Sequence, residues 1–269
     1  MVASLRWELY RLFKRRRSYM GLLAFVALPI LITYALTRGE GFSPGPGEPL
    51  LAATLLNTYY VSLIALLIAI PLFVPALIIM VAGDLVSGEI SDGTLRMVLL
   101  RPVSRTTVVI TKTAVAAFYS VLLLAVLGIT SALAGGIGFG WGPMVSLSGA
   151  LIPQPQAVLS VILAYLFAFV LMMSVVGIAM FLSVATRSSP AAIGATLALV
   201  IGFQILGVFG TFDFLRPYLF TSYFDSWLNL FRTPIYWTPM LKGLAASAGY
   251  AVPLLLAAIS IFRRQDILT

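Results

Sequence analysis

Long apolar stretches, separated by short charged or Gly/Pro-rich segments, are the main pattern of the chain. A helix needs about 20 mostly apolar residues to cross a bilayer. Spans are therefore expected at residues 18–36, 57–82, 106–134, 157–185, 190–210 and 244–262. No charge occurs between Lys112 and Arg187, and the glycines and prolines of residues 135–156 predict the break between two spans there. The pattern predicts one all-α integral membrane domain, residues 1–269, with six transmembrane helices.

The start of the chain predicts a different kind of helix. Leu5, Leu9, Leu12 and Phe13 fall on one helical face, whereas basic side chains lie off it. This pattern is typical of an amphipathic helix in the cytoplasmic membrane interface; a disordered basic tail is the alternative. A cleaved signal peptide fits residues 18–36 poorly, because the stretch before them is long and no small-residue cleavage site follows. We expect an uncleaved first span.

Composition narrows the possible functions. The chain is 61% apolar and 10% charged, with a mean hydropathy of +1.05. A soluble enzyme, a disordered chain and a free nucleic-acid-binding domain are excluded, because one globule of this size cannot hide so much apolar surface. The absence of cysteine and histidine excludes disulfides, Cys/His zinc sites, haem ligation and histidine acid–base catalysis. We expect no catalytic residues, no metal site and no cofactor in this chain.

The net charge of +8 is distributed unevenly between the two sides of the predicted spans. One side holds most of the Lys and Arg residues, at the N-terminus, between the second and third spans, at Arg187 and after the sixth span. Because basic residues concentrate in cytoplasmic loops, both termini of this multi-pass protein should be cytoplasmic, in the cell membrane. The basic charge then serves orientation and attraction to anionic membrane lipids, and we expect no nucleic-acid partner.

Two segments between spans have unusual composition. Residues 83–105 hold the acids Asp84, Glu89 and Asp92, a predicted turn, and a short apolar helix at residues 95–100 that Thr94 caps and Pro102 ends. A short apolar helix in a charged cytoplasmic loop needs a cover, either lipid headgroups or a partner protein. Residues 210–243 are rich in aromatic side chains, which predicts a re-entrant outer segment before the sixth span.

Few polar residues lie inside the predicted spans. Asn57, Ser174 and Gln204 are candidate pathway residues, with Gln204 the strongest because a buried amide needs several partners. Hydrogen bonding between helices is the alternative role for each of them.

Residues 83–112 resemble the second-loop motif of the ATP-binding-cassette (ABC) type-2 permease family. The matching residues are Glu89, Gly93-Thr94-Leu95, Leu99-Leu100, Pro102-Val103-Ser104-Arg105 and Lys112. The amphipathic start, the six spans, the long outer segment and the basic ending FRRQDIL also match that family's layout. The resemblance implies a permease subunit of an ATP-driven transporter, with a cytoplasmic coupling helix between spans 2 and 3.

That family assembles two six-span subunits with two separate ATPase subunits, which bind the ATP and Mg. The resemblance therefore implies two copies of an ABC ATPase and a second permease subunit, either another copy or a paralogue, as partners. It assigns ATPase coupling to Glu89, Asp92, Gly93, Thr94, Leu95, Arg96, Leu99 and Arg101. The chain lacks a G-x-x-x-x-G-K-[ST] loop, so ATP hydrolysis would belong to the partner.

Two other functions fit the sequence. An ion-coupled secondary transporter normally places charges at mid-membrane, and the charged residues here lie at or outside the predicted span ends. A non-transporting membrane assembly subunit is the other alternative. If the chain transports, the uncharged spans favour an apolar or amphipathic substrate, and the resemblance to the type-2 permeases implies export.

Overall fold

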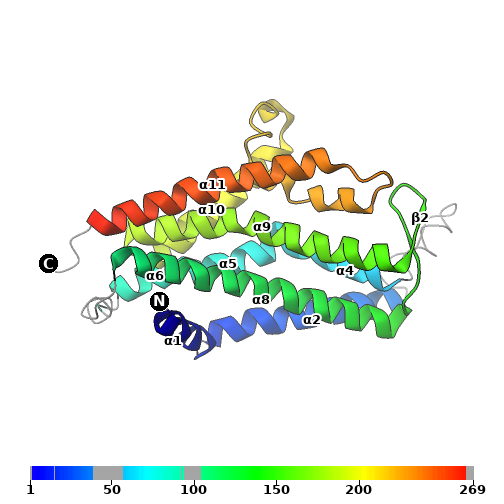
Figure 1. The fold of residues 1–269 in the computed structure, drawn as a ribbon, viewed down its shortest axis with the longest axis horizontal. Coiled ribbons are helices and arrows are strands. Elements are labelled where there is room, and N and C mark those ends of the chain that lie inside the picture. Colours follow the sequence, from blue (N-terminus) through cyan, green and yellow to red (C-terminus); the bar gives the residue numbers. More distant parts are fainter. Residues whose placement is uncertain (1, 15, 39–56, 92, 94–103, 265–269) are drawn as a thin grey trace.

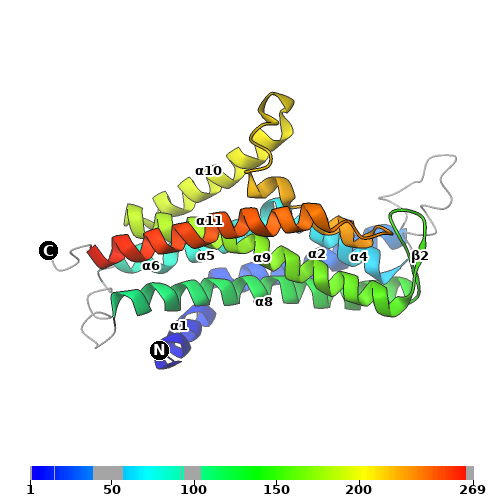
Figure 2. The same cartoon turned by 45° about the horizontal axis from the view of Figure 1, so that its top comes forward.

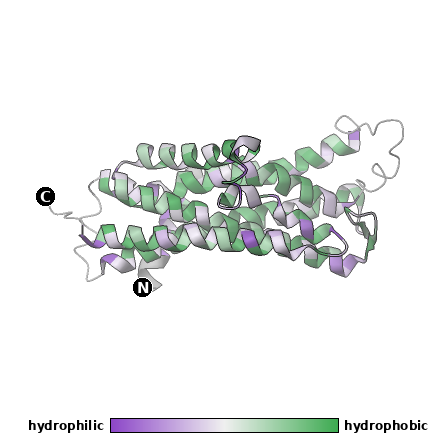
Figure 3. Cartoon of the chain, turned by 90° about the horizontal axis from the view of Figure 1, so that it is seen from above, coloured by the Kyte–Doolittle hydropathy of each residue, from purple (hydrophilic) through white to green (hydrophobic). Residues whose placement is uncertain are grey.

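The chain folds as a bundle of long, nearly parallel helices. The computed structural model describes residues 2–14, 16–38, 57–91, 93 and 104–264. Within them, six helical stretches are long and apolar enough to cross a membrane, so the chain is an all-α, multi-pass membrane protein. The helices run side by side along one axis (Figure 1), and apolar residues predominate along their middle parts (Figure 3). The predicted number of spans is confirmed.

The spans correspond to the following elements. The first is α2 (Arg16–Arg38), and the second is a continuous helical stretch made of α4 (Thr58–Ile68), the π-helix η1 (Ala69–Phe73), α5 (Val74–Ala82) and α6 (Asp84–Ser91). The remaining four are α8 (Arg105–Phe139), α9 (Gln154–Thr186), α10 (Ser189–Val208) and α11 (Trp237–Arg264).

Two smaller features distinguish the ends of the bundle (Figures 1 and 2). At one end, called the hairpin end here, the strands β1 (Met144–Val145) and β2 (Leu151–Ile152) pair antiparallel between α8 and α9. At the other, called the charged end, lie α6, the last turn of α11 and the short helix α1 (Val2–Lys14). Figure 2 shows α1 at an angle to the bundle. The sequence correctly predicted that this segment is helical.

The third span is longer than the sequence predicted. The glycines from Gly135 suggested that the helix ends at residue 134, but α8 continues to Phe139. A Cβ at Gly135 would lie 3.0 Å from the Cα and carbonyl oxygen of Thr58, so this glycine permits α4 to pack closely on α8. Gly136 similarly lies against the ring of Trp141. These glycines serve packing rather than helix termination.

Two prolines change the geometry of the second span, where a bend was predicted. Pro71 lies inside η1, and Pro75 follows it in α5. Because Pro75 has no N–H, the Pro71 carbonyl loses its normal helical donor four residues later. Gln204 of α10 replaces that donor, with its Nε2 2.6 Å from the Pro71 oxygen. The π-helix is thereby tied to the fifth span.

Among the described residues, the most extensive packing between long helices is between α9 and α11. Gly177 permits it, because a Cβ there would lie only 2.9 Å from the Cα of Ala251. One turn away, Ser174 lies 3.3 Å from Ser247, whose hydroxyl donates to the Val170 carbonyl. Small side chains at both surfaces let the backbones approach, as is typical of membrane helices.

Between α10 and α11 the chain forms three short 3-10 helices, η2 (Gly210–Phe212), η3 (Phe220–Tyr223) and η4 (Ser226–Phe231). Phe220, Trp227 and Phe231 are fully buried, and the Phe220 ring makes edge contacts with Phe224 and Tyr250. The aromatic side chains therefore form a small core against the bundle. Since α11 begins at Trp237, this segment is shorter than the predicted residues 210–243.

Candidate functional site: a buried charge cluster

Helix α1 directs two charged side chains into the bundle. Glu8, Arg11 and Leu12 share a face, since residues three and four apart are neighbours on a helix. Leu12 and Glu8 are buried, whereas Trp7 and Tyr10 are exposed on another side. Leu12 therefore anchors α1, and Glu8 enters the protein beside it.

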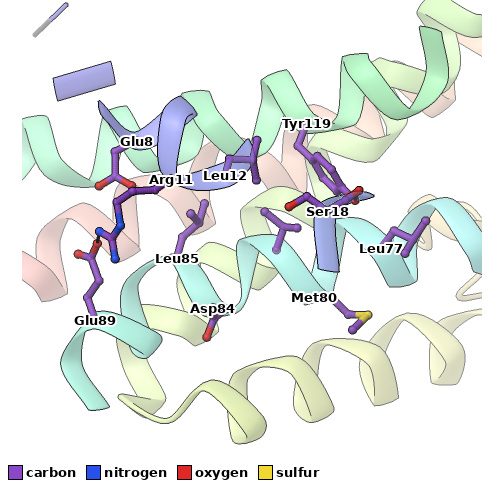
Figure 4. A pocket seen from close by; sticks show the side chains of 11 residues that line it. Glu8, Arg11, Leu12, Ser18, Leu77, Met80, Asp84, Leu85, Glu89 and Tyr119 are labelled. Atoms are coloured by element: carbon purple, nitrogen blue, oxygen red, sulfur yellow. Dashed lines mark hydrogen bonds and ion pairs between the residues drawn. The ribbon is translucent and has the colours of Figure 1, made fainter. Parts of the chain in front are cut away.

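Helix α6 supplies the third charge. Ser183 of α9 fixes this helix, because its hydroxyl donates to the Gly83 carbonyl at 2.7 Å and accepts from the Ser87 backbone N–H at 3.0 Å. The Ser87 hydroxyl also donates to the Gly83 carbonyl, at 2.6 Å. These contacts hold α6 against α9 and leave Glu89 directed toward α1 (Figure 4).

Lys112 of α8 completes the group. Its Nζ lies 3.1 Å from Oε1 of Glu8 and 2.8 Å from Oε2 of Glu89, and Arg11 forms an ion pair with Oε1 of Glu89. The side chains of Lys112, Glu89 and Glu8 are only 1%, 2% and 9% exposed, whereas that of Arg11 is 30% exposed. We call Glu8, Arg11, Glu89 and Lys112 the charge cluster. Figure 4 shows Arg11 reaching from α1 to Glu89.

The cluster is electrically balanced, with two acidic and two basic groups. Bringing a charge out of water costs several kcal/mol, and close opposite charges offset that cost. Lys112 bridges two carboxylates that would otherwise repel each other in a region of low dielectric. Removal of any one buried member therefore leaves the others without a partner charge and destabilises them. The ion pairs of the cluster connect α1, α6 and α8.

Residues on both sides of the undescribed segment 94–103 are also fixed. Gly93 has φ +66°, a conformation that favours glycine, and its N–H donates to the Ile90 carbonyl. Ser104 caps α8, accepting from the Thr107 backbone N–H at 3.1 Å. Arg105 donates to the Arg263 carbonyl at 3.3 Å, at the end of α11. The segment thus follows a turn fixed at the end of α6 and leads into a capped helix that is tied to α11.

The structure brings together two residues of the motif found in the sequence, Glu89 and Lys112. It corrects one expectation, since Glu89 lies buried in a helix and not in a loop between spans; the helical stretch of the second span continues through α6 to Ser91. Gly93 forms the predicted turn. The other coupling residues lie outside the described residues: Asp92, Thr94, Leu95, Arg96, Leu99 and Arg101.

The three candidate pathway residues have different surroundings. Asn57 caps α4, and its amide donates to the Pro143 carbonyl at 2.8 Å. Ser174 is buried between α9 and α11, where it donates to the Leu171 carbonyl. Ser174 thus takes part in the packing of two helices, the alternative role given above, whereas Asn57 attaches the loop that follows α8.

Gln204 borders a cavity. This cavity measures about 720 Å³ and lies between η1, α10, the 3-10 segment and the start of α11. Arg216 and Lys242 line it together with Asp225, and desolvation raises the pKa of the Asp225 carboxyl above its usual range. The cavity thus combines an amide, two cations and an acid.

Sequence reasoning missed Glu8 and Arg11 and did not assign a site role to Lys112. Two signals were available. Glu8 and Arg11 are three residues apart, beside the apolar face of α1, and Lys112 is a single charge at the start of a long uncharged stretch. Their convergence depends on the crossing of α1 over α8, which the sequence alone does not give. Among the described residues, no three acidic side chains group as a metal site.

Comparison with known proteins assigns the sequence to a family. The model of a family described as "Protein of unknown function (DUF2705)" matches residues 53–268. The chain belongs to this family. The DUF2705 match includes Glu89 and Lys112, and it begins after α1, which carries the other half of the charge cluster.

A curated relative is "Uncharacterized protein YhcI" of Bacillus subtilis (strain 168). It is 28% identical over 208 residues, which cover 70% of this chain. The chain spans 63% of the length of that relative.

Proposed function

We propose that the chain is the membrane-spanning permease subunit of an ATP-driven transporter of the ABC type-2 class, and that it exports an apolar or amphipathic substrate. Two separate ATPase subunits supply the energy, and a second permease subunit completes the pathway. The segment 94–103 carries the coupling helix. Both termini and the charged end face the cytoplasm, in agreement with the distribution of basic residues.

The observation that supports this proposal most is the charge cluster. Glu89 and Lys112 begin and end the sequence motif, and their side chains meet at 2.8 Å. The two ends of the motif are therefore clamped together at the base of the segment that would dock on the ATPase. Through Glu8 and Arg11 the same clamp reaches α1, so movement at the segment would be transmitted to three helices.

The cavity beside Gln204 supports a role in passage. A π-helix interrupts the second span at this point, and such interruptions frequently accompany functional sites. The amide of Gln204 holds the interruption in place from α10. A change in the contact between these two spans would alter the cavity directly.

Co-purification tests the proposal. The full chain, tagged at its C-terminus, is extracted from its own membranes in mild detergent, and bound proteins are identified by mass spectrometry. We expect an ATPase with a phosphate-binding loop, whose hydrolysis rate changes when both proteins are placed in liposomes. A matched pair of variants, Gly93→Val in the predicted turn and Gly194→Val at an open position of α10, should separate loss of the ATPase from general damage. Equal retention of the ATPase by both variants would contradict the coupling role.

A second candidate function is ion-coupled transport. The observation that favours it is Lys112, a buried lysine between two carboxylates inside a spanning helix, since intramembrane ionisable groups often carry protons or ions. Transport is measured in proteoliposomes. If it requires a proton gradient and proceeds without ATP, the second function is favoured over the first.

A further inference from the structure

The cavity beside Gln204 is lined by charged side chains from two parts of the chain. Arg216 and Asp225 belong to the segment between α10 and α11, and Lys242 lies in the second turn of α11. Because the last turn of α11 lies at the charged end, its first turns lie away from that end (Figure 2). In the orientation proposed above, the cavity therefore lies away from the cytoplasm.

Arg216 is held in a fixed position at the cavity. Its Nε donates to the Gly207 carbonyl at 2.9 Å, in the last turn of α10, and its Nη1 lies 3.3 Å from Oδ1 of Asp213. A guanidinium carries five N–H donors, so the remaining ones can donate to a ligand. A planar group that is already oriented loses little freedom when it binds an anion. Asp213 offsets part of the charge of Arg216, so the balance of the cavity depends on its other charged groups.

Lys242 and Asp225 have opposite charges that are not paired in the part of the chain that the structure describes. Neither side chain forms an ion pair there, with the other or with a third residue. Desolvation raises the pKa of the Asp225 carboxyl above its usual range, which means that this acid has lost part of its hydration. A positive charge placed beside it would offset that loss.

Aromatic side chains accompany the acid. Tyr223 and Phe224 directly precede Asp225 and line the cavity, as does Tyr236. The hydroxyl of Tyr223 donates to the Pro217 carbonyl at 3.0 Å, which fixes this ring in the wall. The faces of aromatic rings attract ammonium groups, and a nearby carboxylate supplies the full opposite charge. One part of the cavity thus has the chemistry that recognises an ammonium group.

The two cations have the chemistry that recognises an anion. A phosphate directs its oxygens to several sides, so it can accept hydrogen bonds from a guanidinium and from an ammonium on different walls. A ligand with a single charge would leave either Lys242 or Asp225 uncompensated. A ligand that carries both charges compensates the two side chains at once.

We infer that this cavity binds a zwitterionic group in which a phosphate is joined to an ammonium, with the phosphate at Arg216 and Lys242 and the ammonium at Asp225. The head group of a phospholipid such as phosphatidylethanolamine and free phosphoethanolamine share this chemistry. The binding site itself does not depend on transport. Its occupant as the exported substrate rests on the proposed function.

Native mass spectrometry of the full chain tests the class of ligand. The protein in detergent is titrated with dihexanoyl phosphatidylethanolamine and, in parallel, with dihexanoyl phosphatidylglycerol, which has the same phosphate and no ammonium. The first molecule of phosphatidylethanolamine should bind about tenfold more tightly, the factor that corresponds to one charge-assisted contact. Equal affinities for the two lipids would overturn the zwitterionic assignment.

Variants locate the binding site. Asp225→Asn should weaken the binding of phosphatidylethanolamine by about tenfold and leave that of phosphatidylglycerol unchanged, whereas Lys242→Gln should weaken both. The control is Arg232→Gln, because Arg232 is exposed and lies outside the residues that line the cavity. Asp225→Ser serves if Asp225→Asn does not fold. The proposal is wrong if Asp225→Asn and Arg232→Gln have the same effect, or if Asp225→Asn weakens both lipids equally.

Free phosphoethanolamine distinguishes the two sources of the ligand. It should displace bound phosphatidylethanolamine from the unmodified chain. A ligand taken from the membrane requires more phosphoethanolamine than lipid for the same occupancy, and a soluble ligand requires no more. No displacement at any soluble concentration would contradict recognition of the head group. Since the assay contains no ATPase and measures no transport, its result is separate from that of the co-purification experiment.

Discussion

Replacement of Lys112 by methionine tests the charge cluster most sharply. At an effective dielectric constant of about 20, the 2.8 Å and 3.1 Å contacts of Lys112 each contribute about 5–6 kcal/mol of attraction, before desolvation of the charges is subtracted. Lys112→Met removes both contacts and leaves two buried carboxylates close together. Loss of one partner from a buried pair typically costs about 3–5 kcal/mol, and we expect a loss of unfolding free energy in that range.

The matched control is Lys242→Met, because Lys242 is an exposed lysine outside the cluster. The free energy of unfolding is measured in mixed micelles by SDS titration, followed through tryptophan fluorescence. A triple variant with methionine at positions 8, 89 and 112 should recover most of the loss, because apolar replacement of a whole buried pair is often neutral. If Lys112→Met destabilises no more than Lys242→Met, the cluster does not hold the charged end together.

Three further predictions concern other contacts of the bundle. Gly177→Ala should destabilise by about 1–3 kcal/mol, because its Cβ would lie 2.9 Å from Ala251, whereas Gly249→Ala on α11, which meets nothing within 4 Å, should be nearly neutral in the same SDS titration. Gln204→Leu should cost about 0.6–1.7 kcal/mol, and less in a Pro75→Ala background, where the helix regains its own donor to the Pro71 carbonyl; a double-mutant cycle without coupling would contradict that bond. Gly93→Val should cost about 1–3 kcal/mol of local strain at φ +66°, measured as increased hydrogen exchange at Ile90 and Ser91, and unchanged exchange there would refute the strain.

The sequence predicted the number of spans well, because the hydropathy that marks a span is a sum over the residues of that span. Long uncharged stretches give six membrane helices whatever their tertiary contacts, and the face of α1 that carries Leu12 is likewise local. The end of α8 was wrong because glycine is ambiguous: Gly135 breaks a helix in water but permits close packing against Thr58 in a bundle. The sequence around Gly135 does not show that Thr58 will lie against it.

The site was only half predictable for a related reason. The motif around Glu89 marked the correct region, yet an acid beside a turn gives the same local pattern whether it is exposed or buried. Burial of Glu89 depends on Ser183 of α9 and Lys112 of α8, which are distant in sequence. The link from Gln204 to the Pro71 carbonyl likewise requires α10 to lie against the second span.

Site-specific cross-linking from the segment 94–103 tests the proposed coupling most directly. A photoreactive benzoylphenylalanine is placed at Leu99 in the full chain, with Leu133, an exposed residue on α8, as the control position. After irradiation of intact membranes, Leu99 should give an adduct that contains an ATPase with a phosphate-binding loop, and Leu133 should give none. Adducts of Leu99 with lipid alone, while the protein remains folded and active, would contradict the assignment of this segment to an ATPase partner.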